Sequence, residues 1–334
     1  MSIKTVNEAF DEFMYNSVDL DKDVVAQARK SRDNLLENIN EFDNDDFFHL
    51  WKEINIQYGS FARKTKCRKL DDIDLMIGIS ADGATYDGSA TWNDVAITAS
   101  TTNKKQIECS NEDGTLNSTK VINSFRNKLE KVREYLNSDL HKNGQAVTLT
   151  LLSKEWNFDI VPCFHTVEEY DGRSYYLIPN GSGGWLKTDP NIDKKYLSDI
   201  NKSKDGKVLQ LIRLCKKWNK IKHVKTIPSY LFETLIVDYC SSVDKLNDYI
   251  EVRFINFLDF LRTGIYNAVE DVKGIQGDIN TLDFSDKINI ANRASSDYEK
   301  AKEANKAETK EVNQQKAINI WRDIFGDEFP EYDD

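Results

Sequence analysis

The sequence of 334 residues lacks any apolar run that approaches the ~20 residues needed by a membrane-spanning helix. It also lacks the pattern of a signal peptide, because the opening stretch MSIKTVNEAFDEFMY carries acids and no long apolar core. We therefore expect a protein that makes no membrane contact and is located in the cytoplasm.

Paired cysteines and clustered histidines are missing as well. The four histidines are far apart, and none of the five cysteines forms a CxxC pair. Such a set predicts reduced thiols and disfavours a structural zinc site. The cysteines are Cys67, Cys109, Cys163, Cys215 and Cys240.

Positive charge is scarce overall, since 45 basic residues against 56 acidic ones give a formal charge of -11. This balance disfavours wholesale binding of nucleic acid. Residues 202 to 225 depart from it, with nine Lys or Arg and a single acid, Asp205. A charge run is usually a solvated face, but in an acidic chain this one favours a groove that faces phosphate or RNA.

The order of apolar and polar residues predicts a helix-flanked sheet followed by a helical half. Residues 1 to 57 and 119 to 139 have helical patterns, and 80 to 105 form a polar loop with short strands. QAVTLTLL (145 to 152) and WNFDIVPCF (156 to 164) alternate like the two strands of a hairpin.

The second half of the chain is predicted to be helical from about residue 185. Three amphipathic runs are followed by one long helix over 295 to 326, which Gly326 and Pro330 would stop. The segment NGSGGW (180 to 185) has the composition of a flexible connection between the two halves.

Acids inside an apolar strand are the most informative feature. In DIDLMIGI, Asp72 and Asp74 point to one face, because side chains alternate along a strand. Oxygen ligands of this kind suit Mg²⁺ or Mn²⁺, and two such ions ~3.5 to 4 Å apart can activate a hydroxyl and stabilise leaving pyrophosphate. Asp159, another acid in an apolar strand, is the candidate third ligand.

A pair of aspartates alone is also common on solvated strand faces. Gly59 and Ser60, 12 residues before Asp72, strengthen the functional interpretation. A glycine lets backbone amides approach a phosphate closely, and a serine hydroxyl adds a donor.

These motifs resemble a known family. GSFARKTK, DDIDLMI and FDIVPCF are similar to the polymerase-beta-type nucleotidyltransferases, and among them to the bacterial CD-NTases of CBASS antiphage signalling, relatives of cyclic GMP-AMP synthase. LIRLCKKWNK, IPSYLFETLI and AINIWRDIFGDEFP resemble the helical part of that family. The resemblance covers roughly residues 55 to 330.

The resemblance implies an α+β, bilobal nucleotidyltransferase fold, with a mixed sheet lobe, flanking helices and a C-terminal helical lobe. The implied domains are N-terminal helices packing across both lobes (1–57), a catalytic core (58–180) and a helical lobe (181–334).

The family's functional residues map onto eight positions. Asp72, Asp74 and Asp159 would be catalytic and would bind two metal ions, Mg²⁺ or Mn²⁺. The implied nucleotide-binding residues are Gly59, Ser60, Lys216, Ser229 and Tyr230. Gly59, Ser60, Lys216 and Ser229 would contact the donor triphosphate, and Tyr230 would stack on a base.

Two features depart from the family pattern. Lys64 stands where the family often has a glycine, and the sequence closes on EYDD rather than on the small residue that some relatives use for conjugation to a partner. The zinc ligands of the animal DNA sensor are also absent, so its mode of DNA binding is not implied.

The leading hypothesis is an enzyme that joins nucleoside triphosphates into a cyclic di- or trinucleotide and releases pyrophosphate. The alternatives are a terminal transferase that extends RNA 3′ ends and a catalytically silent nucleotide or RNA sensor. The expected partners are the triphosphates, an effector that responds to the product and, from the basic stretch, an RNA activator.

Overall fold

In a computed structural model, which describes residues 2–44, 46–221 and 226–333, the chain divides by its internal contacts into two compact units. The sheet unit comprises Lys22–Arg63 and Leu70–Lys194. The helical unit comprises Met1–Asp21, Lys64–Lys69 and Lys195–Asp334. The predicted α+β class is confirmed.

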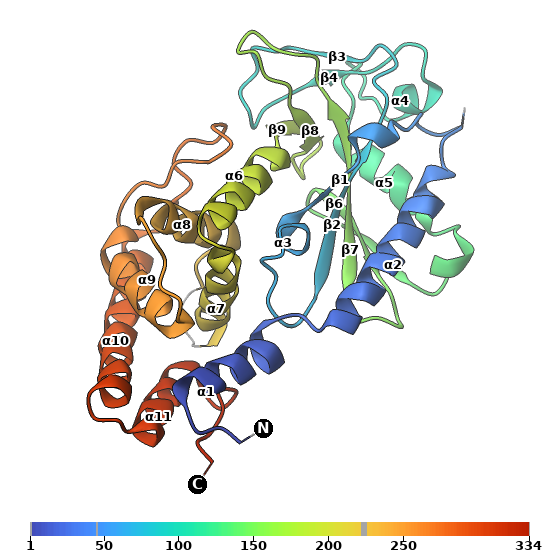
Figure 1. Ribbon diagram of the computed structural model, residues 1–334. Coiled ribbons are helices and arrows are strands. Elements are labelled where there is room, and N and C mark those ends of the chain that lie inside the picture. The colour runs from blue at the N-terminus through green and yellow to red at the C-terminus, as the bar shows by residue number, and fades with distance from the viewer. Residues whose placement is uncertain (1, 45, 222–225, 334) are drawn as a thin grey trace. The chain divides into compact units, whose positions relative to one another are not determined.

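The sheet unit is built around one mixed sheet, in which β2 and β7 are parallel and the remaining neighbours are antiparallel (Figure 1). Its central path consists of β1 (Ile56–Tyr58), β2 (Asp72–Gly78), β7 (Asn157–His165), β6 (Ala146–Thr150) and β5 (Asp139–Asn143), in that order. β8 (Tyr176–Pro179) pairs with β7 and with β9 (Trp185–Thr188), and β3 (Thr85–Tyr86) with β4 (Ile97–Thr98) forms a separate ribbon.

Burial along β2 and β7 changes from one end to the other. Both strands begin by alternating half-buried and buried residues, and from Leu75 and Ile160 onward the side chains are buried on both faces as far as Gly78 and Phe164. The open face is therefore confined to the first residues of the two parallel strands, where the acids lie.

Short helices and one long helix complete the sheet unit. α5 packs on β5, β6, β7 and β8, burying Val121, Ile122, Phe125 and Leu129. The helices of this part are α2 (Lys22–Asn40), α3 (Gly59–Ala62), α4 (Lys104–Glu108) and α5 (Ser118–Leu129), with 3₁₀ turns at Lys52–Ile54 and Arg133–Tyr135. α6 (Pro190–Ser203) begins in the sheet unit and ends in the helical unit.

The helical unit has an aromatic core that joins the two ends of the chain. Phe10 lies 4.9 Å from Trp321 and 5.0 Å from Phe329 between ring centroids. Its further elements are α1 (Val6–Phe13), a π-helical turn (Met14–Val18), α7 (Lys207–Ile221), α8 (Ser229–Ser242), α9 (Ile250–Gly264), α10 (Phe284–Thr309) and α11 (Gln314–Phe325). The first helix is thus part of this core.

Two predicted helices end earlier than expected. The helix predicted to continue to residue 57 ends at Asn40, and the one predicted over 119–139 ends at Leu129. There the backbone amide of Val132 donates to the Leu129 carbonyl, a tight turn that lets Tyr135 become buried. Packing overrides helix propensity at this point.

The long helix predicted over 295–326 is two helices, because the chain breaks between Thr309 and Gln314. Asn313 caps the second one by accepting the Lys316 amide, and Val312 adopts a φ of 52°. The first helix also begins earlier than predicted, at Phe284, where Asp283 accepts the Asp286 amide.

The predicted flexible connection NGSGGW is instead the turn of the β8–β9 hairpin. The Asn180 side-chain oxygen accepts the amides of Ser182 and Gly184, and Gly181 and Gly183 have positive φ. Its glycines therefore permit a tight turn rather than a loose linker. The hairpin predicted over 145–164 is confirmed by the antiparallel pairing of β6 and β7.

No helix in the described ranges is long and apolar enough to cross a bilayer.

Candidate active site

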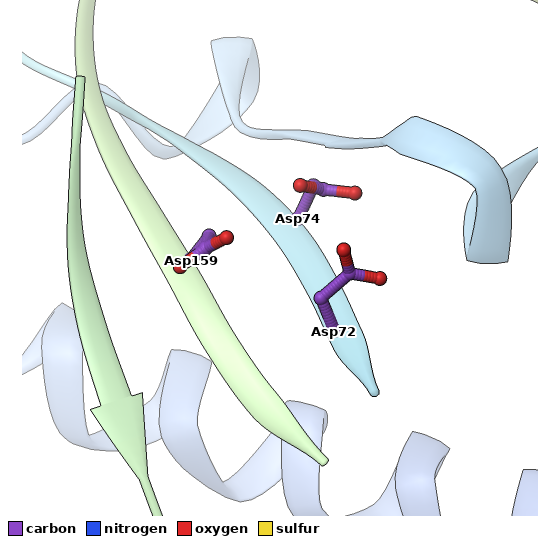
Figure 2. Close-up of side chains that lie close together, drawn as sticks. All are labelled: Asp72, Asp74 and Asp159. Atoms are coloured by element: carbon purple, nitrogen blue, oxygen red, sulfur yellow. The ribbon is translucent and has the colours of Figure 1, made fainter. Parts of the chain in front are cut away.

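The three acids singled out by the sequence meet at the open end of β2 and β7 (Figure 2). Asp74 and Asp159 are register partners on the parallel strands, and Asp72 precedes Asp74 on the same face. One carboxylate oxygen from each lies within 4.8 Å of the others. Three half-buried like charges at this spacing repel one another, which a cation would relieve.

The register extends this pair into a row of four residues across four strands. Tyr58 on β1 lies opposite Asp74, and Thr148 on β6 lies opposite Asp159. The Thr148 hydroxyl donates to Asp159 Oδ1 at 2.6 Å. Burial, together with Asp74 and Asp159, raises the pKa of Tyr58 well above its usual value, so this phenol stays neutral beside the acids.

Sequence reasoning missed Tyr58 and Thr148. The alternation in QAVTLTLL places Thr148 on the polar face of its strand, but nothing in it identifies the acid opposite. Only the strand register reveals that contact.

Position 59 accommodates only glycine, because its backbone lies directly against Asp74. Its φ is +70°, and a Cβ atom at this position would lie 1.7 Å from Asp74 Oδ2. Any side chain would therefore both strain the backbone and displace the carboxylate. The predicted Gly59–Ser60 turn thus lies directly against the acidic cluster, and Ser60 follows in α3.

The backbone conformation at Lys64, in the loop after this turn, explains why the family often has a glycine at this position. Lys64 has a φ of 62°, the left-handed conformation in which glycine carries no steric cost. The exposed lysine keeps this conformation, and its carbonyl accepts a hydrogen bond from Arg213 Nη1 at 3.0 Å.

The other predicted nucleotide-binding residues lie in the helical unit. Lys216 is buried, and its Nζ binds Glu233 Oε1 at 2.7 Å, while Glu233 Oε2 accepts the Thr65 hydroxyl. Ser229 is exposed at the first position of α8. Whether Lys216 and Ser229 contact a nucleotide stays a prediction.

Tyr230, the predicted stacking residue, is half-buried and oriented by its neighbours. Its hydroxyl donates to Asp271 Oδ1 at 2.6 Å, and Lys273 Nζ lies 3.8 Å from its ring centroid. The side chain is thus held in one plane. Base stacking by this ring also stays a prediction.

Several cations of the basic stretch form ion pairs with acids of the same chain. Lys207 pairs with Asp248 at 2.6 Å, and Arg213 pairs with Asp19 at 2.7 Å. Lys217 pairs with Glu328 at 2.7 Å. These contacts make part of the stretch structural, while residues 222 to 225 lie outside the described residues. An RNA-facing groove stays a prediction.

The acidic cluster fits a hard divalent cation. Its ligand set is made of carboxylate oxygens, which suit Mg²⁺ or Mn²⁺ better than softer metals. Asp72, Asp74 and Asp159 are the residues that could hold it.

Comparison with known proteins identifies the family. The chain is 42% identical over 337 aligned positions to a "probable cyclic nucleotide synthase" of Bacillus cereus strain VD146, covering 99% of this chain and 100% of that protein. The chain belongs to the bacterial cyclic nucleotide synthases. The predicted CD-NTase family is therefore confirmed, as is the enzyme class, a nucleotidyltransferase that makes a cyclic oligonucleotide from nucleoside triphosphates.

A more distant relative of this CD-NTase is a cyclic AMP-AMP-AMP synthase of Acinetobacter sp., 26% identical over 209 residues. That match covers 58% of this chain and 56% of the relative. No protein-family model matches the chain.

Solved structures confirm the predicted fold. CdnC of Escherichia coli MS115-1, determined with ATP, has a TM-score of 0.70 at 17% identity and covers 97% of this chain and 98% of its own. Vibrio cholerae DncV, in complex with a linear intermediate, has a TM-score of 0.59 at 13% identity. That match covers 83% of this chain and 69% of DncV.

Proposed function

We propose that this CD-NTase uses Asp72, Asp74 and Asp159 to join nucleoside triphosphates, with release of pyrophosphate, and then closes the linear product into a ring. One observation carries the assignment of this site. Three carboxylates converge at the start of the parallel strands β2 and β7, where one face of these strands is only half-buried. The core over residues 58–180 is assigned to catalysis, and the lobe over 181–334 to contacts with the nucleotides.

Two Mg²⁺ or Mn²⁺ ions would neutralise the triphosphate and lower the pKa of the attacking ribose hydroxyl when bound. Asp72 and Asp74 would hold both ions. Asp159 would complete the acceptor-side site and accept the proton of that hydroxyl. The Thr148 hydroxyl donates a hydrogen bond to Oδ1 of this carboxylate.

The remaining residues would bind and orient the donor. The backbone at Gly59 can approach the triphosphate closely because no Cβ intervenes, and Ser60 adds a hydroxyl donor. In the helical unit Lys216 and Ser229 would meet phosphate oxygens, and Tyr230 would stack on a base. For Lys216 this contact requires sharing its Nζ with Glu233.

The product would act on a downstream effector in antiphage defence, and an RNA activator would bind the part of the 202–225 stretch that is not engaged internally. Both partners follow from the family resemblance and the charge pattern.

One reaction tests the function. Purified protein is incubated with Mg²⁺ and Mn²⁺ in parallel and with labelled triphosphates singly and mixed, and phosphatase is added afterwards. Asp72→Ala/Asp74→Ala serves as the blank, with all-adenine cyclic trinucleotide as one standard. A small phosphatase-resistant product that the blank lacks supports the proposal. If RNA is added to the same reaction and is lengthened while no such product forms, the result would instead support a terminal transferase.

A further inference from the structure

We propose that Thr148 is a positioning residue for the active site, and that its hydroxyl orients the Asp159 carboxylate toward the cation. This inference rests on the proposed function of the acidic cluster. The short hydrogen bond from Thr148 Oγ1 to Asp159 Oδ1, 2.6 Å long, carries it.

The fold gives this hydroxyl little freedom. Thr148 and Asp159 are direct cross-strand partners in the antiparallel pair β6–β7, so their side chains share one face of the sheet. Thr148 is 5% exposed, and a β-branched side chain has few χ1 rotamers on a strand. The donor is therefore aimed at the carboxylate before any nucleotide arrives.

The consequence is an asymmetric carboxylate. Because Oδ1 accepts the hydrogen bond from Thr148 Oγ1, the plane of the carboxylate is set and Oδ2 is left as the better metal ligand. Outer-shell hydrogen bonds of this kind commonly orient a metal ligand, and their loss typically costs about 10- to 100-fold in metal affinity or activity. Asp72 and Asp74, on the next strand, belong to the same acidic cluster.

A purely structural role for Thr148 makes a different prediction. A buried hydroxyl that only satisfies its own hydrogen bond would affect thermal stability when removed, but not metal binding or turnover. The two roles are separated by variants that keep the shape of the residue and change its donor.

The test compares three variants. Thr148→Val has the same shape without the donor, and Thr148→Ser keeps the donor. Thr150→Val is the matched control, because Thr150 lies on the same strand and face, opposite Asn157 on β7 and Asp139 on β5 rather than opposite an acid of the cluster. Mn²⁺ binding is measured by calorimetry without nucleotide, and kcat and KM are measured from pyrophosphate release.

We expect Thr148→Val to weaken Mn²⁺ binding and to lower kcat by about 10-fold each, with the KM for triphosphate nearly unchanged. Thr148→Ser should recover most of both, and Thr150→Val should match the wild type. Equal Mn²⁺ affinity and kcat in Thr148→Val and Thr150→Val would overturn the proposal.

Failure of the proposed function can be distinguished from failure of the positioning role. If the wild-type protein makes no cyclic product, the Mn²⁺ measurement still decides whether Thr148 orients the cluster. If the wild type is active and Thr148→Val is equally active with unaltered Mn²⁺ binding, only the positioning role is lost. Melting temperatures of all variants show whether a loss comes from unfolding.

Discussion

The acidic cluster of the sheet unit and the buried ion pairs of the helical unit hold charge in contrasting ways. In the sheet unit, Asp72, Asp74 and Asp159 gather with oxygens within 4.8 Å of one another. In the helical unit, several buried charges are joined to opposite ones, such as Lys216 to Glu233 at 2.7 Å and Lys273 to Asp271 at 3.2 Å.

This difference separates function from stability. Like charges held together weaken the folded state, and such clusters are typical of sites that bind a cation or a substrate. Opposite charges that are paired in a core are tolerated because each is neutralised by its partner, and removing one partner is strongly destabilising. Variants of the acidic cluster should therefore change activity, and variants of buried ion pairs in the helical unit that have no proposed nucleotide contact should change stability.

The largest effect is expected for Asp74→Asn, measured as pyrophosphate release. We expect a loss of about 10³-fold or more, because the central ligand of the cluster is removed. The melting temperature without metal should hold or rise, since repulsion is relieved. Asp71→Asn is the control, because this exposed neighbour precedes β2, and it should stay within about twofold. Equal losses in both variants would place the site elsewhere.

The opposite pattern is expected for Asp297→Ala in the helical unit. Asp297 is 1% exposed and accepts the Trp218 Nε1 proton at 2.8 Å, with Arg293 Nε 3.8 Å away. Removing it should lower the free energy of unfolding by about 3 kcal/mol or more. Urea unfolding followed by tryptophan fluorescence measures this loss.

The matched control for that loss is the exposed pair of Lys302 and Glu299, 3.5 Å apart. Lys302→Ala should change the free energy of unfolding by less than about 0.5 kcal/mol. A comparable loss in the two variants would mean that burial of the pair does not decide its contribution.

Glu251 sharpens the comparison, because it is a buried acid of the helical unit that forms no ion pair among the described residues. Burial raises its pKa from 4.5 to about 7, with Glu308 and Asp11 adding to the shift. The folded protein thus holds a proton that the unfolded chain has released, so stability falls as pH rises from about 4.5 to about 7.

Glu251→Gln should remove this pH dependence and raise stability at pH 8 by on the order of 2 kcal/mol. Urea unfolding of both proteins at pH 5 and pH 8 measures the change. Parallel pH profiles of the two proteins would contradict the assignment to Glu251.

The smallest effect is expected for Lys64→Gly. The lysine at φ 62° carries backbone strain that a glycine would relieve, and the greater freedom of glycine in the unfolded chain offsets part of the gain. We expect a gain below about 1 kcal/mol in urea unfolding. Lys69→Gly, another exposed position of the same loop with no positive φ, should lose stability instead.

The acids could be predicted from the sequence because the signal is local. Asp72 and Asp74 lie two residues apart in one apolar strand, and Asp159 interrupts another. The hairpin of β6 and β7 was equally local. The turn at NGSGGW was assigned wrongly because glycine-rich composition suits both a flexible linker and a tight hairpin, and only the pairing of β8 and β9 distinguishes them.

The break between α10 and α11 was missed for a related reason. Residues 310 to 313 contain neither glycine nor proline, and the cap that Asn313 provides depends on the following helix turning onto α10. The contacts of the basic stretch were also outside sequence reasoning, since Arg213 finds Asp19 and Lys217 finds Glu328 across long stretches of chain.

The sequence by itself determined the chemistry of the site, because alternation and charge are properties of neighbouring residues. It specified three acids on strand faces and a glycine-serine turn before them. The tertiary structure decided which groups touch: the register that sets Thr148 and Tyr58 beside the acids, the contact of Gly59 with Asp74, and the ion partners of the lysines. These depend on pairing between segments distant in sequence, where the free energy of packing, and not local preference, selects one arrangement.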